Sequence, residues 1–469
     1  MKTGLLLSVV SFLAGTALAA PVVVKGPYAQ DVAEGAVTIV WETSGAAQVT
    51  LKHGYTPEAL DGETLSPAGT MHEVRLTGLE KGKTLYYRLE GVEAKQNAYA
   101  EGGTNSLSGM VQLPPVAGEW KFVVVGDTRS GHGTHHSITK LIAAERPAFV
   151  VNTGDLVSDG LVEENWGKFF DIEHDLLVSA PLFPVIGNHD SENSTADLYF
   201  KYFAPPKNPE GTEAYYKARF GNMLILVLDS EVATYLGSLS DAQRAWIETE
   251  LAAAARDASI EHRFAAIHQG PFASDPDRSG NASVRGLMEV FKVGFTNAIF
   301  SGHDHNYERG LSENGVTYVV TGGGGASLYD IGPVGTRGWP PHEVVYNKKD
   351  YNYVLVTIDG LHARFEAKDL SGATIDAFEY TAAPVEECKV DADCEASPKP
   401  HDACTGTWKC AAPVCEWVCI GGGDGGDPAD GGPAGGDGTD AGRGTDAAGA
   451  VSPAQGDSAG GCGCSTLGS

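Results

Sequence analysis

Cysteine is absent from the first 387 of the 469 residues, and all eight cysteines lie from Cys388 onward. No cysteine follows the apolar segment at the N-terminus, so a bacterial lipid anchor is not expected. No C-x-x-C pair occurs among the eight, which disfavours a cysteine-based zinc site. We expect three disulfides among the first six, in a pairing that the sequence does not fix. These six are Cys388, Cys394, Cys404, Cys410, Cys415 and Cys419.

Basic residues are also scarce: 33 Lys and Arg stand against 61 Asp and Glu, and the formal net charge is -28 at pH 7. Nucleic acids and anionic membrane surfaces require a basic footprint, so neither is expected as a partner. A run of 18 apolar residues is missing after the first 20 residues, so we expect no membrane span.

The first residues, MKTGLLLSVVSFLAGTALAA, have the three parts of a secretory signal peptide. Lys2 supplies the positive start, Leu5 to Leu13 form the apolar core, and Ala17 and Ala19 give the small-x-small cleavage pattern. We therefore expect a signal peptide over residues 1–19 and an exported protein that is periplasmic, attached to the cell surface or secreted.

The rest of the chain divides into four segments that differ from one another in sequence pattern and composition. Residues 22–113 alternate in polarity, as in AVTIVWET with Val37, Ile39 and Trp41 on one face, and predict a β-sandwich. Residues 119–382 alternate strands with helices and predict an α/β domain. Residues 386–419 form the cysteine-rich module. Residues 420–469 are rich in glycine and aspartate, without aromatic residues from 421 to 461, and predict a flexible tail.

The strands of the predicted α/β domain are nearly continuous apolar runs, such as FVVV, AFVVNT, MLILVLDS and AIFSG. Strands covered on both faces have this pattern. Between two of them, LSDAQRAWIETELAAAAR predicts an amphipathic helix from Leu239 to Arg256, capped by Ser240 or Asp241.

Five of these strands stop on residues that commonly bind metals. One such stop is more often a turn or a packed histidine, but five in chain order favour a functional site. In open α/β sheets, ligands bind beyond the carboxyl ends of the strands. In chain order the stops are Asp127, Asp155, Asn188 with His189, His268, and His303 with His305.

Carboxylates, imidazoles and one carboxamide suit borderline divalent metals better than a thiolate site would. A carboxylate can bridge two ions about 3.5–4 Å apart. Such a pair binds phosphoryl oxygens, lowers the pKa of a bound water and offsets charge in the transition state.

The ordered set, with FSGHDHNYER and VVTGGGGASLY, resembles the calcineurin-like metallophosphoesterase superfamily, and in particular the purple acid phosphatases. This resemblance implies a fibronectin type III-like N-terminal domain and a four-layer metallophosphoesterase sandwich. It implies two metal ions, Fe, Zn or Mn, and hydrolysis of a small phosphate ester, with phosphomonoesters favoured, by a metal-activated hydroxide.

The resemblance also implies a role for each residue. Asp155 would bridge the two ions, Asp127 and His305 would hold the first ion, and Asn188, His268 and His303 would hold the second. His189 would donate a proton or contact the phosphate, with Asp190 orienting it.

Two positions depart from the family pattern. Arg129 stands where the superfamily has the histidine of GDxH, and Ser158 stands where the purple enzymes have the tyrosine of GDxxY. The first ion thus lacks an expected ligand, for which His132, His135 or His136 could substitute. Arg129 itself could clamp a phosphate oxygen or form a structural salt bridge.

Other functions remain open at this point. The protein could be a phosphodiesterase or nucleotidase, or a surface binding or adhesion protein with an impaired phosphoesterase core. The C-terminal GGCGCSTLGS resembles the start of a myxobacterial sorting signal, although the apolar helix and basic end are missing. It raises the possibility of cell-surface association through the tail.

Overall fold

The computed structural model describes residues 20–115, 118–192, 195–232, 237–338 and 341–382, together with the backbone of three short strands near the C-terminus. The expected signal peptide lies outside these residues. The chain divides into two units, Met1–Val385 and Glu386–Ser469, which are described separately.

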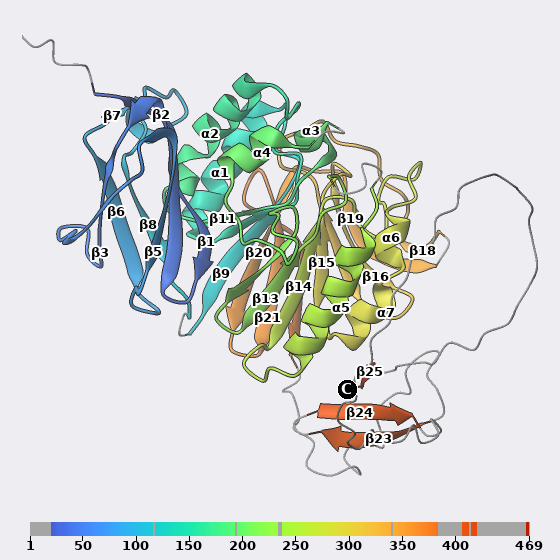
Figure 1. Ribbon diagram of the computed structural model, residues 1–469. Helices are drawn as coiled ribbons and strands as arrows, with labels where there is room; N and C mark the ends of the chain where they lie inside the picture. Colours follow the sequence, from blue (N-terminus) through green and yellow to red (C-terminus); the bar gives the residue numbers. More distant parts are fainter. Residues whose placement is uncertain are drawn as a thin grey trace, which may run out of the picture. The chain divides into compact units, whose positions relative to one another are not determined.

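The first unit begins with two four-stranded antiparallel sheets, apart from one parallel pairing at an edge (Figure 1). Val23, Ile39 and Trp41 of one sheet and Leu51 and Leu85 of the other are fully buried in the same core. This arrangement fits the expected fibronectin-like sandwich. One sheet consists of β5 (Gly69–Thr77), β2 (Ala36–Ala47), β1 (Val22–Ala33) and β7 (Glu93–Ala94), the other of β4 (Gly62–Leu65), β3 (Thr50–Gly54), β6 (Thr84–Glu90) and β8 (Ser108–Gln112).

The rest of the first unit contains two larger mixed sheets. One has six strands in the order β11 (Leu182–Pro184), β10 (Val150–Asn152), β9 (Trp120–Val125), β20 (Asn352–Asp359), β21 (His362–Asp369) and β22 (Thr374–Thr381). The other has eight, in the order β12 (Tyr216–Phe220), β13 (Met223–Val227), β14 (His262–Ile267), β15 (Ala298–Ser301), β17 (Thr317–Thr321), β16 (Tyr307–Ser312), β19 (His342–Lys348) and β18 (Gly335–Arg337). Strands β9 to β11 are parallel to one another, as are β13, β14, β15 and β17.

The central strands β9, β10, β13, β14 and β15 are buried on both faces, as their apolar runs predict, whereas outer strands such as β18 and β22 are partly exposed. Phe122 of β9 packs near Phe264 of β14, with ring centroids 5.7 Å apart, so one face of each sheet lines a shared core. Val123, the next residue of β9, packs into a second core with Trp166 of α2 (Glu163–Leu177). The sheets therefore pack on each other, and helices cover their outer faces.

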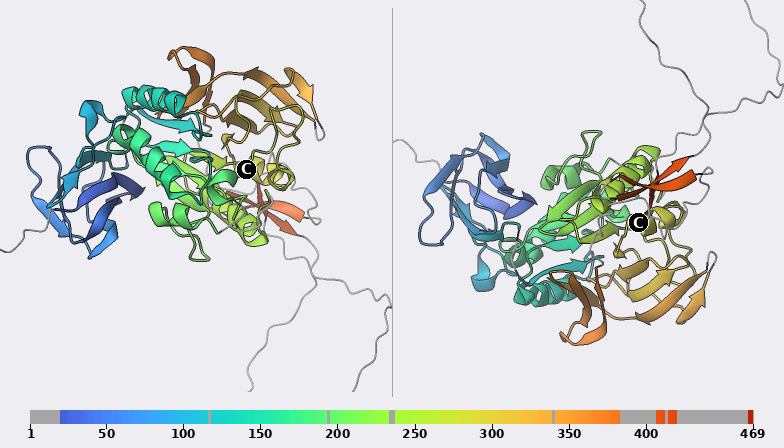
Figure 2. Two further views of the ribbon diagram at one scale, coloured as in Figure 1. Left: turned by 90° about the horizontal axis from the view of Figure 1, so that it is seen from above. Right: turned by 90° about the horizontal axis from the view of Figure 1, so that it is seen from below.

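Helices α1 (His132–Glu145) and α2 lie beside the six-stranded sheet, whereas α5 (Asp241–Ala255), α6 (Ala282–Arg285) and α7 (Met288–Val293) lie beside the eight-stranded one (Figures 1 and 2). The short helices α3 (Asn188–Ser191) and α4 (Asp197–Tyr202) follow β11, and η1 (Glu101–Gly103) precedes β8. Ser240 caps α5 by accepting a 3.1 Å hydrogen bond from the Gln243 amide, which confirms the expected start of that helix.

The second unit contains the antiparallel pair β23 (Gly406–Ala411) and β24 (Val414–Cys419), with β25 (Thr466–Gly468) added to β24. The expected disulfides concern side chains outside the described part. Strand β25 lies within the segment predicted to lack structure. A strand of three residues can pair with a neighbouring strand through backbone hydrogen bonds alone, and amino-acid composition does not predict such pairing.

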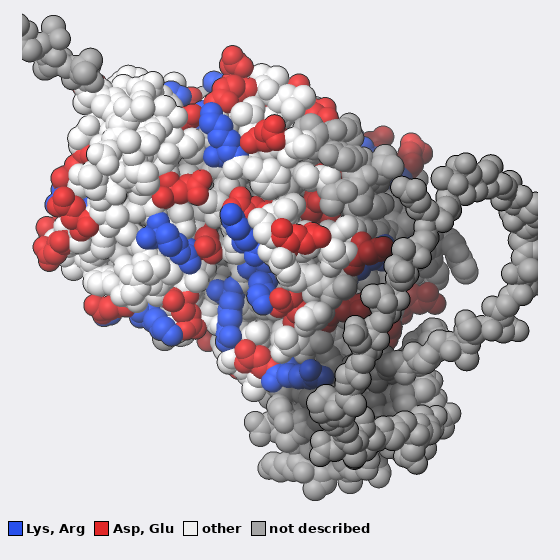
Figure 3. Space-filling model, viewed as in Figure 1, with Lys and Arg blue, Asp and Glu red and all other residues white. Residues whose placement is uncertain are grey.

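Charged side chains on the face in Figure 3 are mixed, with basic groups lying among acidic ones. This face offers no basic footprint for a polyanion. Among the described residues, no helix has the length and apolarity that a membrane span requires.

We predict that a chain ended after Val385 keeps its fold and its metal site, because all candidate ligands lie in the first unit. Thermal unfolding and metal analysis of the purified truncated and full-length proteins would test this. A folded truncated protein that has lost its metal would contradict the division.

Candidate metal centre

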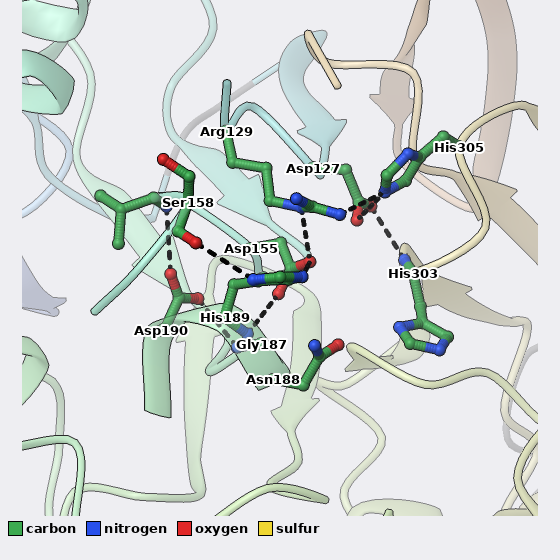
Figure 4. A network of polar contacts seen from close by, with 12 residues as sticks. Asp127, Arg129, Asp155, Ser158, Gly187, Asn188, His189, Asp190, His303 and His305 are labelled. Carbon is green, nitrogen blue, oxygen red and sulfur yellow. Dashed lines mark hydrogen bonds and ion pairs between the residues drawn. The ribbon is translucent and has the colours of Figure 1, made fainter. Parts of the chain in front are cut away.

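The strand ends of both large sheets meet at one edge (Figure 4). Asp127 follows β9, Asp155 follows β10 and Asn188 follows β11, all from the six-stranded sheet. His268 follows β14 and His303 follows β15 of the eight-stranded sheet. The two sheets thus supply ligands to the same site from opposite sides.

Sharp backbone turns direct these side chains into the site. Asp127, Asp155 and His303 have positive φ angles of 56°, 55° and 69°. Non-glycine residues seldom adopt this conformation, and it clusters at functional sites. The His303 amide donates a 2.8 Å hydrogen bond to Asp127 Oδ2. A Cβ atom on Gly302 would overlap that same oxygen, so only glycine permits this approach.

Asp127, Asp155 and His268 are at most 1% exposed, and they offer ligand atoms that all lie within 4.8 Å of one another. Asp127 Oδ1 is buried and has no hydrogen-bond partner in the described part of the chain. A buried carboxylate is costly unless a cation or hydrogen bonds offset its charge. The cluster therefore has the chemistry of a cation site.

The tautomer of His268 supports this interpretation. Its Nδ1 lies 2.9 Å from the Thr153 carbonyl oxygen and donates to it, which leaves the Nε2 lone pair facing the site. That Nε2 lies 3.0 Å from Asn188 Oδ1, 3.2 Å from His303 Nδ1 and 3.3 Å from Asp155 Oδ1. Metal-binding histidines typically donate their other ring N–H in this way.

His305 is held similarly. Its Nδ1 donates to the Ser327 carbonyl oxygen at 2.7 Å, and its Nε2 lies 3.2 Å from Asp127 Oδ1. The Tyr329 ring stacks on the His305 ring, with centroids 3.9 Å apart, and restricts its rotation. His305 and Asp127 thus face each other with acceptor atoms, as the resemblance implies for the first ion.

The pKa values of His268 and His303 are shifted because charged and buried groups lie close together in the site. Burial lowers the pKa of His268, but the Asp155 and Asp127 carboxylates outweigh burial and raise it to about 9. Burial and the neighbouring His268 lower the pKa of His303 to about 2. Since a metal must displace the proton on His268, ion binding should weaken as pH falls.

The donor set around His268 therefore fits a borderline divalent ion. Asn188, His268 and His303 would hold it together with Asp155, which agrees with the set expected for the second ion. The residues expected to hold the first ion, Asp127, Asp155 and His305, also lie close together, but the Arg129 side chain lies among them. Arg129 Nε is 3.0 Å from Asp155 Oδ2, and its Nη2 is 3.5 Å from His305 Nε2.

His189 lies at the rim of the site with its side chain 29% exposed. Its Nδ1 is 3.1 Å from both the Ser158 carbonyl oxygen and Glu192 Oε1, and its Nε2 is 4.0 Å from Asp155 Oδ2. His189 and Glu192 are three residues apart, and side chains at this spacing lie next to each other on a helical turn. The HDSE sequence therefore contained a signal for this contact. The sequence analysis missed Glu192.

Asp190 does not orient His189 in the way expected. Its two oxygens accept hydrogen bonds from the Val157 and Gly187 amides at 3.1 and 2.8 Å, and the residue is fully buried. Burial and the nearby Asp155 raise its pKa well above the usual value. Asp190 ties the loop after β10 to the loop after β11, and is therefore a positioning residue.

The three histidines considered as substitute ligands are placed elsewhere. His135 Nε2 contacts Glu173 Oε1 at 2.5 Å, and the His136 ring meets Tyr99 edge-on at 5.2 Å. His132 is exposed and lines a narrow crevice beside Arg129. His135 and His136 are thus directed to other partners and do not complete the first set.

A cavity of about 450 Å³ opens beside His303. Its lining includes Gln269, Phe272, Arg278 and Asp304, of which Arg278 donates to Asp304 Oδ1 at 3.1 Å. This cavity has room for a small organic group next to the candidate ligands. None of these lining residues was singled out by the sequence analysis.

We predict that Asp155→Ala abolishes metal binding, because Asp155 faces both ligand sets and its loss leaves His268 without a carboxylate at 3.3 Å. Metal analysis after dialysis would measure this. Asp61→Ala, an exposed residue of the sandwich, is the matched control and should keep its metal. A folded Asp155→Ala protein with the wild-type metal content would exclude Asp155 as a ligand.

The sequence of this region matches a known family: residues 121–307 fit the Calcineurin-like phosphoesterase profile. Purple acid phosphatase 15 of Arabidopsis thaliana is 26% identical over 59% of this chain and 60% of its own length. An uncharacterized protein of Mycobacterium tuberculosis is 26% identical over 40% of this chain and 44% of its own length. The chain therefore spans 60% and 44% of the lengths of these two relatives.

Solved structures share the fold. The purple acid phosphatase PPD1 from yellow lupin (Lupinus luteus) seeds superposes with a TM-score of 0.61 at 18% identity, over 82% of this chain and 78% of its own. The structure of PhoD gives a TM-score of 0.56 at 12% identity, and the match covers 78% of this chain and 90% of the PhoD chain. Residues 121–307 thus match a calcineurin-like phosphoesterase domain, and the chain is similar in sequence to a purple acid phosphatase.

Proposed function

We propose that the protein is an exported, metal-dependent phosphoesterase that hydrolyses small phosphate esters, with phosphomonoesters preferred. The observation that carries this proposal is the convergence of buried acceptor atoms at the edge of two sheets. The ligand atoms of Asp127, Asp155 and His268 lie within 4.8 Å of one another, and Asp127 Oδ1 has no hydrogen-bond partner among the described residues. Asp155 Oδ1 accepts one hydrogen bond, from the His189 amide at 2.9 Å, and lies 3.3 Å from His268 Nε2.

A divalent ion bound there supplies Lewis-acid stabilisation of a phosphoryl oxygen and lowers the pKa of a water. The chain supplies orientation. The Arg129 guanidinium, 16% exposed, presents N–H donors at the same edge and can bind a phosphoryl oxygen. The cavity beside His303 can receive the ester's organic group.

His189 is suited to donate a proton to the leaving oxygen. Its Nδ1–H is directed at the Ser158 carbonyl and the Glu192 carboxylate, each 3.1 Å away. The Glu192 carboxylate holds the ring in this orientation, while Nε2 remains on the side of Asp155 and of the substrate. A proton on Nε2 can then pass to the ester oxygen as its bond to phosphorus breaks.

The monoester preference rests on two supports. The chain is similar to a purple acid phosphatase of Arabidopsis thaliana, and the cavity of about 450 Å³ beside the ligands suits one small organic group.

The proposal of export rests on the pattern of residues 1–19 alone. The proposal of attachment to a cell surface rests on the resemblance of the C-terminal residues to a sorting signal. The Arg129 position favours one competing function, a binding protein with an impaired core.

We predict that the full-length protein hydrolyses p-nitrophenyl phosphate faster than bis(p-nitrophenyl) phosphate, because the cavity accommodates one organic group. The two rates are compared after loading with Mn²⁺, Zn²⁺ or Fe²⁺, with the Asp155→Ala protein as the blank. A faster diester rate would replace the proposal with a phosphodiesterase. A metal-loaded protein inactive on both esters would favour the binding function.

We predict that His189→Ala lowers kcat by about 10²–10⁴, the usual effect of losing a positioned proton donor. Its metal content should not change, because its ring lies 4.0 Å from Asp155 Oδ2, outside the ligand set. His362→Ala, 43% exposed on β21, is the control. An unchanged kcat in His189→Ala would remove this residue from the mechanism.

A further inference from the structure

The guanidinium of Arg129 lies where the first ion is expected. Its Nε is 3.0 Å from Asp155 Oδ2 and its Nη2 is 3.5 Å from His305 Nε2 (Figure 4). His305 donates its Nδ1–H to Ser327, so its Nε2 is an acceptor and matches the Arg129 donor. Two of the atoms that would bind the first ion thus already face a cation that belongs to the chain.

Backbone contacts fix this arginine at the site. The Arg129 amide donates to the Asp155 carbonyl oxygen at 3.2 Å, and its own carbonyl accepts from the Gly131 amide at 2.9 Å. Ser130 has a φ of 63°, so the chain turns sharply just after Arg129. The side chain is only 16% exposed. The guanidinium is therefore part of the built site and not a mobile surface group.

A guanidinium cannot share the position with a metal, because it stays protonated and has no lone pair to offer. The charge near it is also limited. Asp127 and Asp155 are the carboxylates that face the ligand atoms, whereas Asp190 is bonded to backbone amides. A second divalent ion would add two positive charges against the same two carboxylates, beside an arginine.

We propose that this centre binds one metal ion, and that Arg129 acts as its second cation. The ion is held by Asp155, Asn188, His268 and His303. Arg129 takes the place of the first ion, neutralises Asp155 from the other side and offers its outer N–H groups to a phosphoryl oxygen. Only this last role rests on the proposed phosphoesterase function, since the number of bound ions does not depend on the substrate.

The metal content of the full-length protein tests the proposal directly. After loading with Mn²⁺ and dialysis, the wild type should retain one ion per chain, measured by mass spectrometry of the metal. Arg129→His restores the missing ligand and removes the competing charge, so it should retain two. In electron paramagnetic resonance, the wild type should show isolated Mn²⁺, and Arg129→His a spin-coupled pair.

Two further variants make the result decisive. Arg278→Ala removes an arginine that donates a 3.2 Å hydrogen bond to the His303 carbonyl oxygen, and this variant should still retain one ion. Arg129→Gln removes the charge but supplies no imidazole, and should bind a second Mn²⁺ with lower affinity than Arg129→His. It also serves as the test if Arg129→His fails to fold, which circular dichroism would reveal.

The possible failures are distinguishable. Two retained ions in the wild type, or one ion in every folded Arg129 variant, would overturn the one-metal centre but leave the phosphoesterase proposal intact. A wild type that retains no ion would overturn both. One ion in the wild type without ester hydrolysis would confirm the metal count and reject the proposed function.

Discussion

The site depends on two carboxylates that are almost completely removed from water. Asp127 and Asp155 are 0% and 1% exposed, and they face the Nε2 atoms of His305 and His268, which are acceptors when the imidazoles are neutral. Such a group of acceptors is unfavourable unless a positive charge lies among them. Protonated His268, the Arg129 guanidinium and a divalent ion are the three ways in which this chain can meet that requirement.

The fold brings these groups together by stacking two sheets whose parallel strands end at the same edge. Residues of the central strands alternate between the core shared by the sheets and the cores under the helices, as Phe122 and Val123 do in β9. The N-terminal sandwich contributes to this arrangement. Gln30 of β1 donates a 2.9 Å hydrogen bond to the Leu182 carbonyl of β11, the strand that leads to Asn188. The sandwich thereby supports a strand that carries a ligand.

The sequence was sufficient to predict which candidate ligands meet at the sheet edge, because strands buried on both faces give apolar runs and five of these runs stop on a residue type that commonly binds metals. It could not predict which groups would pair beyond that. The His189–Glu192 contact depends on the conformation of a single helical turn. The position of the Arg129 side chain depends on the conformation of the loop after β9. Strands β5 and β6 follow one another in the chain but belong to different sheets of the sandwich, and this assignment depends on long-range pairing. The same holds for β20, which joins β9 across more than half of the first unit.

The origin of the ligands in two different sheets has a consequence for folding. An ion held by Asp155 from one sheet and by His268 and His303 from the other is a cross-link between segments that are far apart in the chain. Its binding free energy is then also free energy of sheet association, since the unfolded chain does not present these ligands together. With such an ion bound, metal loading and resistance to unfolding would be thermodynamically linked, and a chelator would act on the whole α/β body and not only on the edge where the candidate ligands meet.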